Sequence, residues 1–255
     1  MFEIHPLRAF SDNYIWTLIK DNEVTVVDPG DAGPVKEFLI DKSLILKNIL
    51  VTHHHFDHTG GIEDLSANFN CNVFGPAGNH INGITKTLVE GDQFEISNVT
   101  FRVLSTPGHT LDHLSFYTDN NQPLLFSGDT LFFGGCGRLF EGTPQQMFES
   151  LAKFSELPLD TQIFCGHEYT ESNLNFAAEV EPHNTELNIK LEEVRKLRKK
   201  DKITLPSSIA TELSVNPFMR CNESGVIKAA QEYSQTNVSQ GEEVLGVIRD
   251  WKDNF

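Results

Sequence analysis

The apolar residues of this chain fall into short runs that end abruptly at polar turn residues. Residues 13–19 and 24–28 are rich in β-branched and aromatic side chains, and Asp21-Asn22 separates them, which is typical of a hairpin. Residues 47–52 contain an unbroken apolar run, as expected for a strand buried on both faces. Residues 31–42 carry helical spacing between these strands. The pattern predicts alternating strands and helices at the start of the chain.

The same alternation continues for more than half of the chain, and then it stops. Short apolar runs bounded by Gly, Pro and Asn predict strands, and longer periodic stretches predict helices. We expect strands at 72–74, 93–96, 99–104, 114–117, 124–126 and 162–165, a turn at 119–121, and helices ending near 68 and covering 144–154. Beyond His167 only helical periodicity remains, at 173–180, 184–201 and 242–251. This change predicts a first domain over 1–167 and a smaller helical domain over 168–255.

Polar side chains with metal-binding chemistry stand where the predicted strands end. The apolar run at 49–51 is followed directly by THHHFDHTGG at 52–61. Three later strands stop at a glycine followed at once by His109, Asp129 or His167. Glycine allows the sharp turn, so the next side chain is left at the mouth of the strand.

Together the strand ends supply seven candidate ligands, which are His53, His55, Asp57, His58, His109, Asp129 and His167. In an extended segment His53 and His55 point to one side and His54 to the other, so His54 is expected to be structural. Seven ligands are too many for one ion and suit two, with one carboxylate shared between them. Imidazole and carboxylate together suit zinc, with iron or manganese as alternatives. A water between two such ions becomes hydroxide near neutral pH.

Composition narrows the class of protein without naming a substrate. The 255 residues include 39% hydrophobic residues and 19 Phe, which is ample for a folded core. The net charge of -16 argues against nucleic-acid binding, since nucleic-acid binders usually present a basic face. No apolar run is long enough to cross a membrane, no secretory signal is visible, and the four cysteines form no CxxC pair. We therefore expect a cytoplasmic, monomeric protein with reduced thiols.

These motifs give the chain a resemblance to a known family. The HxHxDH pattern in THHHFDHTGG, with His109 in TPGHT, Asp129 in SGDT and His167 in GHE, resembles the metallo-β-lactamase superfamily. Within it, GGCGRLFEGT at 134–143, the CGHEYT segment from 165 and NPFMR at 216–220 resemble the hydroxyacylglutathione hydrolase (glyoxalase II) family. The resemblance covers essentially the whole chain. It implies an α/β fold, a four-layer αβ/βα sandwich, followed by a helical C-terminal domain.

The resemblance also implies a ligand set and a reaction. One metal ion would take His53, His55 and His109, the other would take Asp57, His58 and His167, and Asp129 would bridge both. The family cleaves S-D-lactoylglutathione and related 2-hydroxyacylglutathiones to glutathione and a hydroxy acid such as D-lactate, the second step of methylglyoxal detoxification. A bridging hydroxide would attack the thioester carbonyl, and Asp57 is a candidate acceptor of its proton.

Glutathione carries two carboxylates, so cationic side chains must hold it. The family's glutathione-binding residues map onto Arg138, Tyr169, Arg249 and Lys252, together with Phe140 where some members carry Tyr. Phe140 has no hydroxyl, so one contact of the family scheme is missing or replaced. Arg249 and Lys252 are three residues apart and would share one face of a helix.

Three competing functions remain open at this point. A glutathione-persulfide dioxygenase of the superfamily uses a single iron and would not need His58 or His167 as ligands. A ribonuclease of the superfamily is disfavoured, because the acidic chain would repel RNA. A non-catalytic metal-binding protein of the same fold would have little reason to keep all seven ligands. Metal analysis together with a hydrolysis assay separates these alternatives.

Overall fold

The computed structural model describes residues 1–78, 80–119 and 122–255. It divides into two compact units. The first comprises Met1–Ser105 and Asp112–Gly128, and the second comprises Thr106–Leu111 and Asp129–Phe255. The chain therefore passes from one unit to the other at three points. Within the described ranges, no helix is both long enough and apolar enough to span a bilayer.

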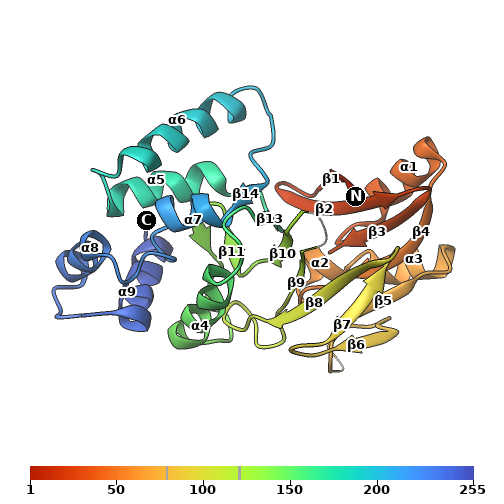
Figure 1. Cartoon of the computed structure of the whole chain (residues 1–255), viewed down its shortest axis with the longest axis horizontal. Coiled ribbons are helices and arrows are strands. Elements are labelled where there is room, and N and C mark those ends of the chain that lie inside the picture. Colours follow the sequence, from red (N-terminus) through yellow and green to blue (C-terminus); the bar gives the residue numbers. More distant parts are fainter. Residues whose placement is uncertain (79, 120–121) are drawn as a thin grey trace. The chain divides into compact units, whose positions relative to one another are not determined.

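The first unit contains most of the strands (Figure 1). Its strands are β1 (Glu3–Ala9), β2 (Asn13–Lys20), β3 (Glu23–Val27), β4 (Ile45–Leu50), β5 (Asn72–Pro76), β6 (Lys86–Leu88), β7 (Gln93–Ile96), β8 (Val99–Ser105), β9 (Leu114–Thr118) and β10 (Leu124–Gly128). Its helices are α1 (Ala32–Lys42), α2 (Phe56–Thr59) and α3 (Ile62–Asn68).

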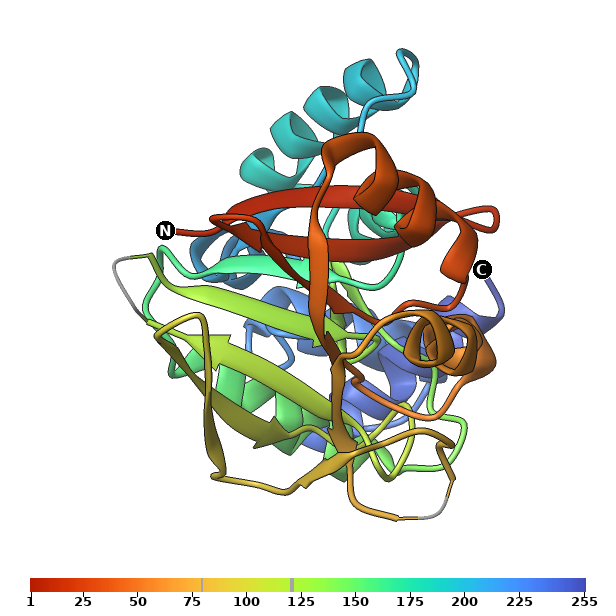
Figure 2. The ribbon, with the colours of Figure 1, turned by 90° about the vertical axis from the view of Figure 1, so that its right-hand side faces the viewer.

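Strands β1 to β6 form one sheet in chain order, antiparallel from β1 to β3 and parallel from β3 to β6. The parallel register needs crossovers, which α1 and the α2–α3 segment provide. Figure 2 shows α1 lying across the red strands of this sheet. Val35 and Leu39 of α1 are buried with Val26 and Ile49 of the sheet in one apolar cluster. The buried run that leads into the histidine loop is therefore a central strand.

A second layer of strands follows in the order β7-β8-β9-β10, all antiparallel. Its aromatic side chains pack against the first sheet. The rings of Phe74 on β5 and Phe94 on β7 stack with centroids 4.9 Å apart, and Phe94 also contacts Phe101 and Phe116. Offset aromatic contacts of this kind bury large apolar areas and fix the two layers against each other.

The second unit is mainly helical. It contains two short hairpin strands, β11 (Leu131–Phe132) and β12 (Gly135–Cys136), the paired strands β13 (Gln162–Cys165) and β14 (Ser207–Ser208), and six helices. The helices are α4 (Pro144–Ser155), α5 (Thr170–Val180), α6 (Thr185–Arg198), α7 (Ile209–Val215), α8 (Ser224–Ser234) and α9 (Gly241–Asp253). Helices α5 and α6 lie side by side, as do α8 and α9 (Figure 1).

Most of the predicted elements are present, with bounds shifted by a few residues. The helix predicted at 31–42 begins at Ala32 because the Asp31 side chain accepts from the Gly33 amide as an N-cap. The helix predicted at 144–154 is α4, and Thr143 and Gln146 form a capping box at its start. The predicted turn at 119–121 includes Asn120 and Asn121, which lie outside the described residues.

Several elements were not predicted. Strand β1 was missed because Pro6 interrupts its pattern, which an edge strand paired only with β2 tolerates. The pattern also gave no clear signal for the short strands β6, β11, β12 and β14, or for helices α7 and α8.

Candidate metal centre and substrate pocket

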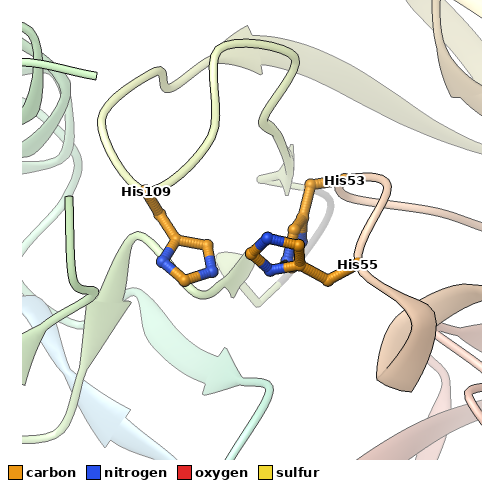
Figure 3. Close-up of side chains that lie close together, drawn as sticks. All are labelled: His53, His55 and His109. Atoms are coloured by element: carbon orange, nitrogen blue, oxygen red, sulfur yellow. Dashed lines mark hydrogen bonds between the residues drawn. The ribbon is translucent and has the colours of Figure 1, made fainter. Parts of the chain in front are cut away.

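The loop after β4 brings two imidazoles of the first unit together. His53 Nε2 lies 3.0 Å from His55 Nδ1, and the two ring centroids are 4.7 Å apart (Figure 3). His53 is completely buried and also stacks on the ring of His113. The ring of His54 is 3.0 Å from an Asp112 carboxylate oxygen instead. His54 thus has its own partner.

A buried carboxylate orients the loop from behind. Asp28, directly after β3, accepts hydrogen bonds from the Thr52 amide at 2.8 Å and the Thr52 hydroxyl at 2.7 Å. Its Oδ2 also lies 3.0 Å from His58 Nδ1. Because a carboxylate only accepts, the network assigns the proton of His58 to Nδ1, so the lone pair of this ring is on Nε2. The Thr52 hydroxyl, having donated to Asp28, accepts from His53 Nδ1 at 2.9 Å, so the proton of His53 also sits on Nδ1.

Sequence reasoning treated Asp28 only as part of a turn. Its backbone φ of +53° is unusual for a residue with a side chain, and such strain often marks a functional position. An Asp at the end of a buried strand, followed by Pro-Gly, was the available signal. Asp28 is thus the partner that fixes the tautomer of His58, one of the candidate metal ligands.

Asp57 is the carboxylate of the same loop. Its Oδ2 accepts from Asn13 Nδ2 at 2.9 Å and lies 3.5 Å from His58 Nε2. Its side chain is 41% exposed, whereas His58 is buried, so Asp57 is the more accessible of the two. Asn13, at the start of β2, was not singled out by the sequence, because nothing in a strand pattern shows which loop a strand end supports.

The second unit carries the remaining three candidate ligands. His109 stands in the loop that follows β8 (Figure 3), Asp129 follows β10, and His167 follows β13. Asp129 Oδ2 lies 3.3 Å from His167 Nε2 and 3.5 Å from His109 Nε2. The backbone carbonyl of Arg138 lies 2.8 Å from His109 Nδ1, so the proton sits on Nδ1 and Nε2 again keeps its lone pair.

Gly137 makes room for this group. A Cβ at position 137 would lie 2.1 Å from the Asp129 carbonyl oxygen and 3.0 Å from His109 Nδ1. Only glycine fits such a close approach of the backbone. This explains one glycine of the GGCGR motif.

The donor set of each unit suits divalent metal ions. In the first unit the Nδ1 atoms of His53 and His58 are engaged by Thr52 and Asp28, and in the second unit Nδ1 of His109 is engaged by a backbone carbonyl. Such outer contacts are typical of metal-bound histidine. Zinc, iron and manganese all accept these ligands.

The second unit also contains a cavity of about 630 Å³ whose lining includes the candidate ligand His109. The five predicted substrate-binding residues line it as well, and they are Arg138, Phe140, Tyr169, Arg249 and Lys252. The Phe140 ring is 62% exposed and contacts the His109 ring edge-on at 5.3 Å. The Tyr169 ring stacks on His167, with centroids 4.7 Å apart and planes within 4° of parallel.

Arg249 and Lys252 of α9 occupy different environments in this cavity. Arg249 is 6% exposed and donates to the Cys136 carbonyl at 2.8 Å and to Asp253 at 3.1 Å. Lys252 donates to the carbonyl and hydroxyl of Ser172, both at 3.2 Å. Burial, with help from the neighbouring Arg249 and Arg138 charges, lowers the pKa of Lys252 to about 8. The sequence predicted that both side chains bind substrate, and in the structure both line the cavity while Arg249 also contacts protein groups.

Cys136 lies beneath this pair and is unsuited to nucleophilic chemistry. Its side chain is 3% exposed, and burial raises the pKa of its thiol to about 11 in spite of the nearby Arg249. A thiol is a nucleophile only as thiolate, so packing explains Cys136.

Comparison with known proteins identifies the class. Residues 12–167 match the family described as metallo-beta-lactamase superfamily. The crystal structure of BLEG-1 B3 metallo-beta-lactamase superposes on 86% of this chain and 99% of its own with a TM-score of 0.63 and 25% identity. The chain therefore belongs to the metallo-β-lactamase superfamily.

The second half of the comparison is more specific. Residues 168–255 match the hydroxyacylglutathione hydrolase C-terminus. The hydroxyacylglutathione hydrolase of Idiomarina loihiensis is 49% identical over 98% of this chain and 99% of its own length, and that of Pseudomonas aeruginosa is 48% identical over the full length of both. This chain belongs to the hydroxyacylglutathione hydrolase family.

Proposed function

We propose that this chain is a metal-dependent thioester hydrolase that cleaves S-D-lactoylglutathione and related 2-hydroxyacylglutathiones. The observation that carries the proposal is the cavity of the second unit, where His109 and the cations Arg138, Arg249 and Lys252 line one space. A substrate with an anionic tail and a reactive carbonyl is the kind of molecule such a cavity accommodates. The full-length identity to hydrolases of this name supports the same substrate class.

We further propose a dinuclear centre with zinc as the resident metal. His53, His55 and His109 would hold one ion, Asp57, His58 and His167 would hold the other, and Asp129 would bridge them. Bound there, two divalent ions would supply an activated water and a Lewis acid for the thioester carbonyl. The Nδ1 partners of His53, His58 and His109 support this assignment, because each ring then carries its lone pair on Nε2, the atom that would bind the metal.

The proposed domain boundary follows His167, where the two family matches meet. The catalytic domain would be 1–167, and the glutathione-binding domain would be 168–255. We also infer a cytoplasmic enzyme, because all four cysteines are free thiols, which a reducing compartment preserves.

Side chains of the protein bind the glutathione tail and accept a proton. Arg138 and Lys252 bind the carboxylates of the glutathione tail, and Tyr169 forms an aromatic wall beside His167. Asp57, held by Asn13 and partly exposed, accepts the proton released as the nucleophile attacks. The thiol of the leaving group has a pKa of about 8.5, so expulsion of the thiolate needs no strong general acid.

The function is tested by hydrolysis of S-D-lactoylglutathione before chelation, after chelation, and after return of zinc, iron or manganese. We expect activity to disappear with the metal and to return with it. The S-lactoyl thioester of N-acetylcysteamine, which lacks both carboxylates, serves as the control and should be cleaved far more slowly. Oxygen consumption with glutathione persulfide, in the absence of thioester hydrolysis, would instead establish the iron dioxygenase.

The role of Asp57 is tested with Asp57→Asn. The amide keeps the shape and the Asn13 contact but cannot accept a proton. We expect kcat to fall by at least about tenfold in a protein that still contains two metal ions. Full activity with both ions retained would exclude Asp57 as the proton acceptor.

A further inference from the structure

One carboxylate lies among the cations of the substrate cavity. Asp253, the last residue of α9, lines that cavity and has a side chain that is 36% exposed. Its Oδ1 lies 3.0 Å from Arg138 Nε and 3.1 Å from Arg249 Nη2. A single carboxylate oxygen therefore pairs with two guanidinium groups from different segments of the second unit.

The two arginines differ in how far solvent can reach them. Arg249 is held on three sides, by the Cys136 carbonyl, by Asp253 and by the face of the Phe218 ring at 5.1 Å. The Arg138 side chain is 60% exposed and contacts Asp253 through Nε. Asp253 thus orients the guanidinium group of Arg138 through Nε and does not pair with its two terminal nitrogens. A guanidinium of this kind is ready for a second, bidentate carboxylate.

Charge counting shows what Asp253 changes. Arg138, Arg249 and Lys252 give the cavity three positive charges, and Asp253 reduces the sum to two. A glutathione tail carries two carboxylates and one ammonium group, so it enters with one net negative charge. The tail is the same in the thioester substrate and in the glutathione that is released. Any attraction between the cavity and the tail therefore holds product as firmly as substrate.

We propose that Asp253 is a built-in counter-ion that positions Arg138 and weakens the hold of the cavity on the glutathione tail, which favours release of product. This inference rests on the proposed glutathione thioester hydrolase function. Sequence reasoning did not single out Asp253, because only the fold shows that its carboxylate lies between two arginines.

The test compares Asp253→Asn with the matched control Asp250→Asn. Both substitutions remove one negative charge from α9, but the Asp250 side chain is exposed and contacts Tyr233 and Asn254 outside the cavity. KM and kcat for S-D-lactoylglutathione are measured at pH 6.5, where Lys252 is protonated, and the Kd of glutathione is measured by calorimetry on the metal-loaded enzyme. A carboxylate removed from a few ångströms away in a half-solvated pocket predicts KM and Kd lower by about fivefold.

Under the proposal, Asp253→Asn lowers KM and the glutathione Kd together, leaves the metal content unchanged, and does not raise kcat, whereas Asp250→Asn changes neither KM nor Kd. An unchanged or higher KM in Asp253→Asn would show that Asp253 only positions the arginines and does not weaken binding, and it would overturn the proposal. Equal effects in both variants would overturn it as well, because the charge would then act from anywhere on the helix.

Two further arms keep the result interpretable. Should Asp253→Asn fail to fold, Asp253→Ser makes the same comparison with a smaller side chain, and the same fall in KM is expected. A wild-type protein that neither cleaves the thioester nor binds glutathione would overturn the proposed function, and the role of Asp253 with it. A wild-type protein that does both, beside an Asp253→Asn that binds no more tightly, would overturn the counter-ion alone.

Discussion

Replacing Asp28 with Asn tests whether an outer carboxylate governs metal binding. Three donors converge on Asp28, which are the Thr52 amide, the Thr52 hydroxyl and His58 Nδ1, at 2.7 to 3.0 Å. An amide has only one acceptor atom, so in either orientation its NH₂ group faces at least one of these donors. The side chain is 4% exposed, so water cannot repair the mismatch.

The size of the effect follows from these contacts. Losing one buried hydrogen bond to a charged group, and leaving its donor without an acceptor, costs about 2 to 4 kcal/mol in the free energy of unfolding. In the orientation that turns the NH₂ group toward His58, the partner that fixes the tautomer of His58 is also lost, and changes to such outer partners typically weaken metal binding by about 10 to 100-fold. We therefore expect Asp28→Asn to fold less stably and to retain less metal.

The assay is urea unfolding of the metal-free protein, with metal affinity from competition with a chromogenic chelator. Asp31→Asn is the matched control. It carries the same charge change three residues away, where the side chain only caps α1 through the Gly33 amide, and Asn caps as well as Asp. An Asp28→Asn protein within about twofold of wild-type metal affinity and as stable as Asp31→Asn would refute the assigned role of Asp28.

Three further predictions concern the second unit. Gly137→Ala places a Cβ 2.1 Å from the Asp129 carbonyl oxygen, so we expect destabilisation by about 1 to 3 kcal/mol and reduced metal content. Gly225→Ala, whose nearest neighbour would be 3.6 Å away, should neither destabilise the protein nor reduce its metal content. The pKa of Lys252 is lowered to about 8, so its positive charge attracts the substrate below that pH and is lost above it. KM should therefore rise between pH 7 and 9 in the wild type and stay constant in Lys252→Arg. Burial raises the pKa of Glu212 from 4.5 to about 7, so its contribution to stability is complete below pH 4.5 and is lost as the pH rises through 7. The free energy of unfolding should fall by on the order of 3 kcal/mol over this range. Urea unfolding of Glu212→Gln should lack this pH dependence.

The strand-end motifs predicted the candidate ligands because local chemistry determines them. A buried strand, a glycine turn and a metal-binding side chain lie within a few residues of one another, as at Gly128-Asp129 and Gly166-His167. The central strands and the capped helices were predicted for the same reason. Their signals are short in sequence and do not depend on distant partners.

The partners of these residues could not be predicted in this way. Asp28 and His58 are thirty residues apart, and Asp253 and Arg138 are more than a hundred apart, so only the fold shows their pairing. The contacts of Arg249 could not be predicted from the sequence either. Its spacing from Lys252 predicted a shared face of α9, but the spacing could not show that the Cys136 carbonyl would engage its guanidinium group.

The short segment Thr106–Leu111 has a consequence for how this protein can be divided. It belongs to the second unit, although the chain on both sides of it belongs to the first. It is fastened there by hydrogen bonds from Phe140 to His109, from Gly142 to Gly108 and from Ser150 to Pro107. A single cut after Gly128, where the chain last enters the second unit, would separate this segment from Phe140, Gly142 and Ser150. No single cut in the chain therefore releases the second unit whole, and an engineered version of either unit has to carry both of its stretches.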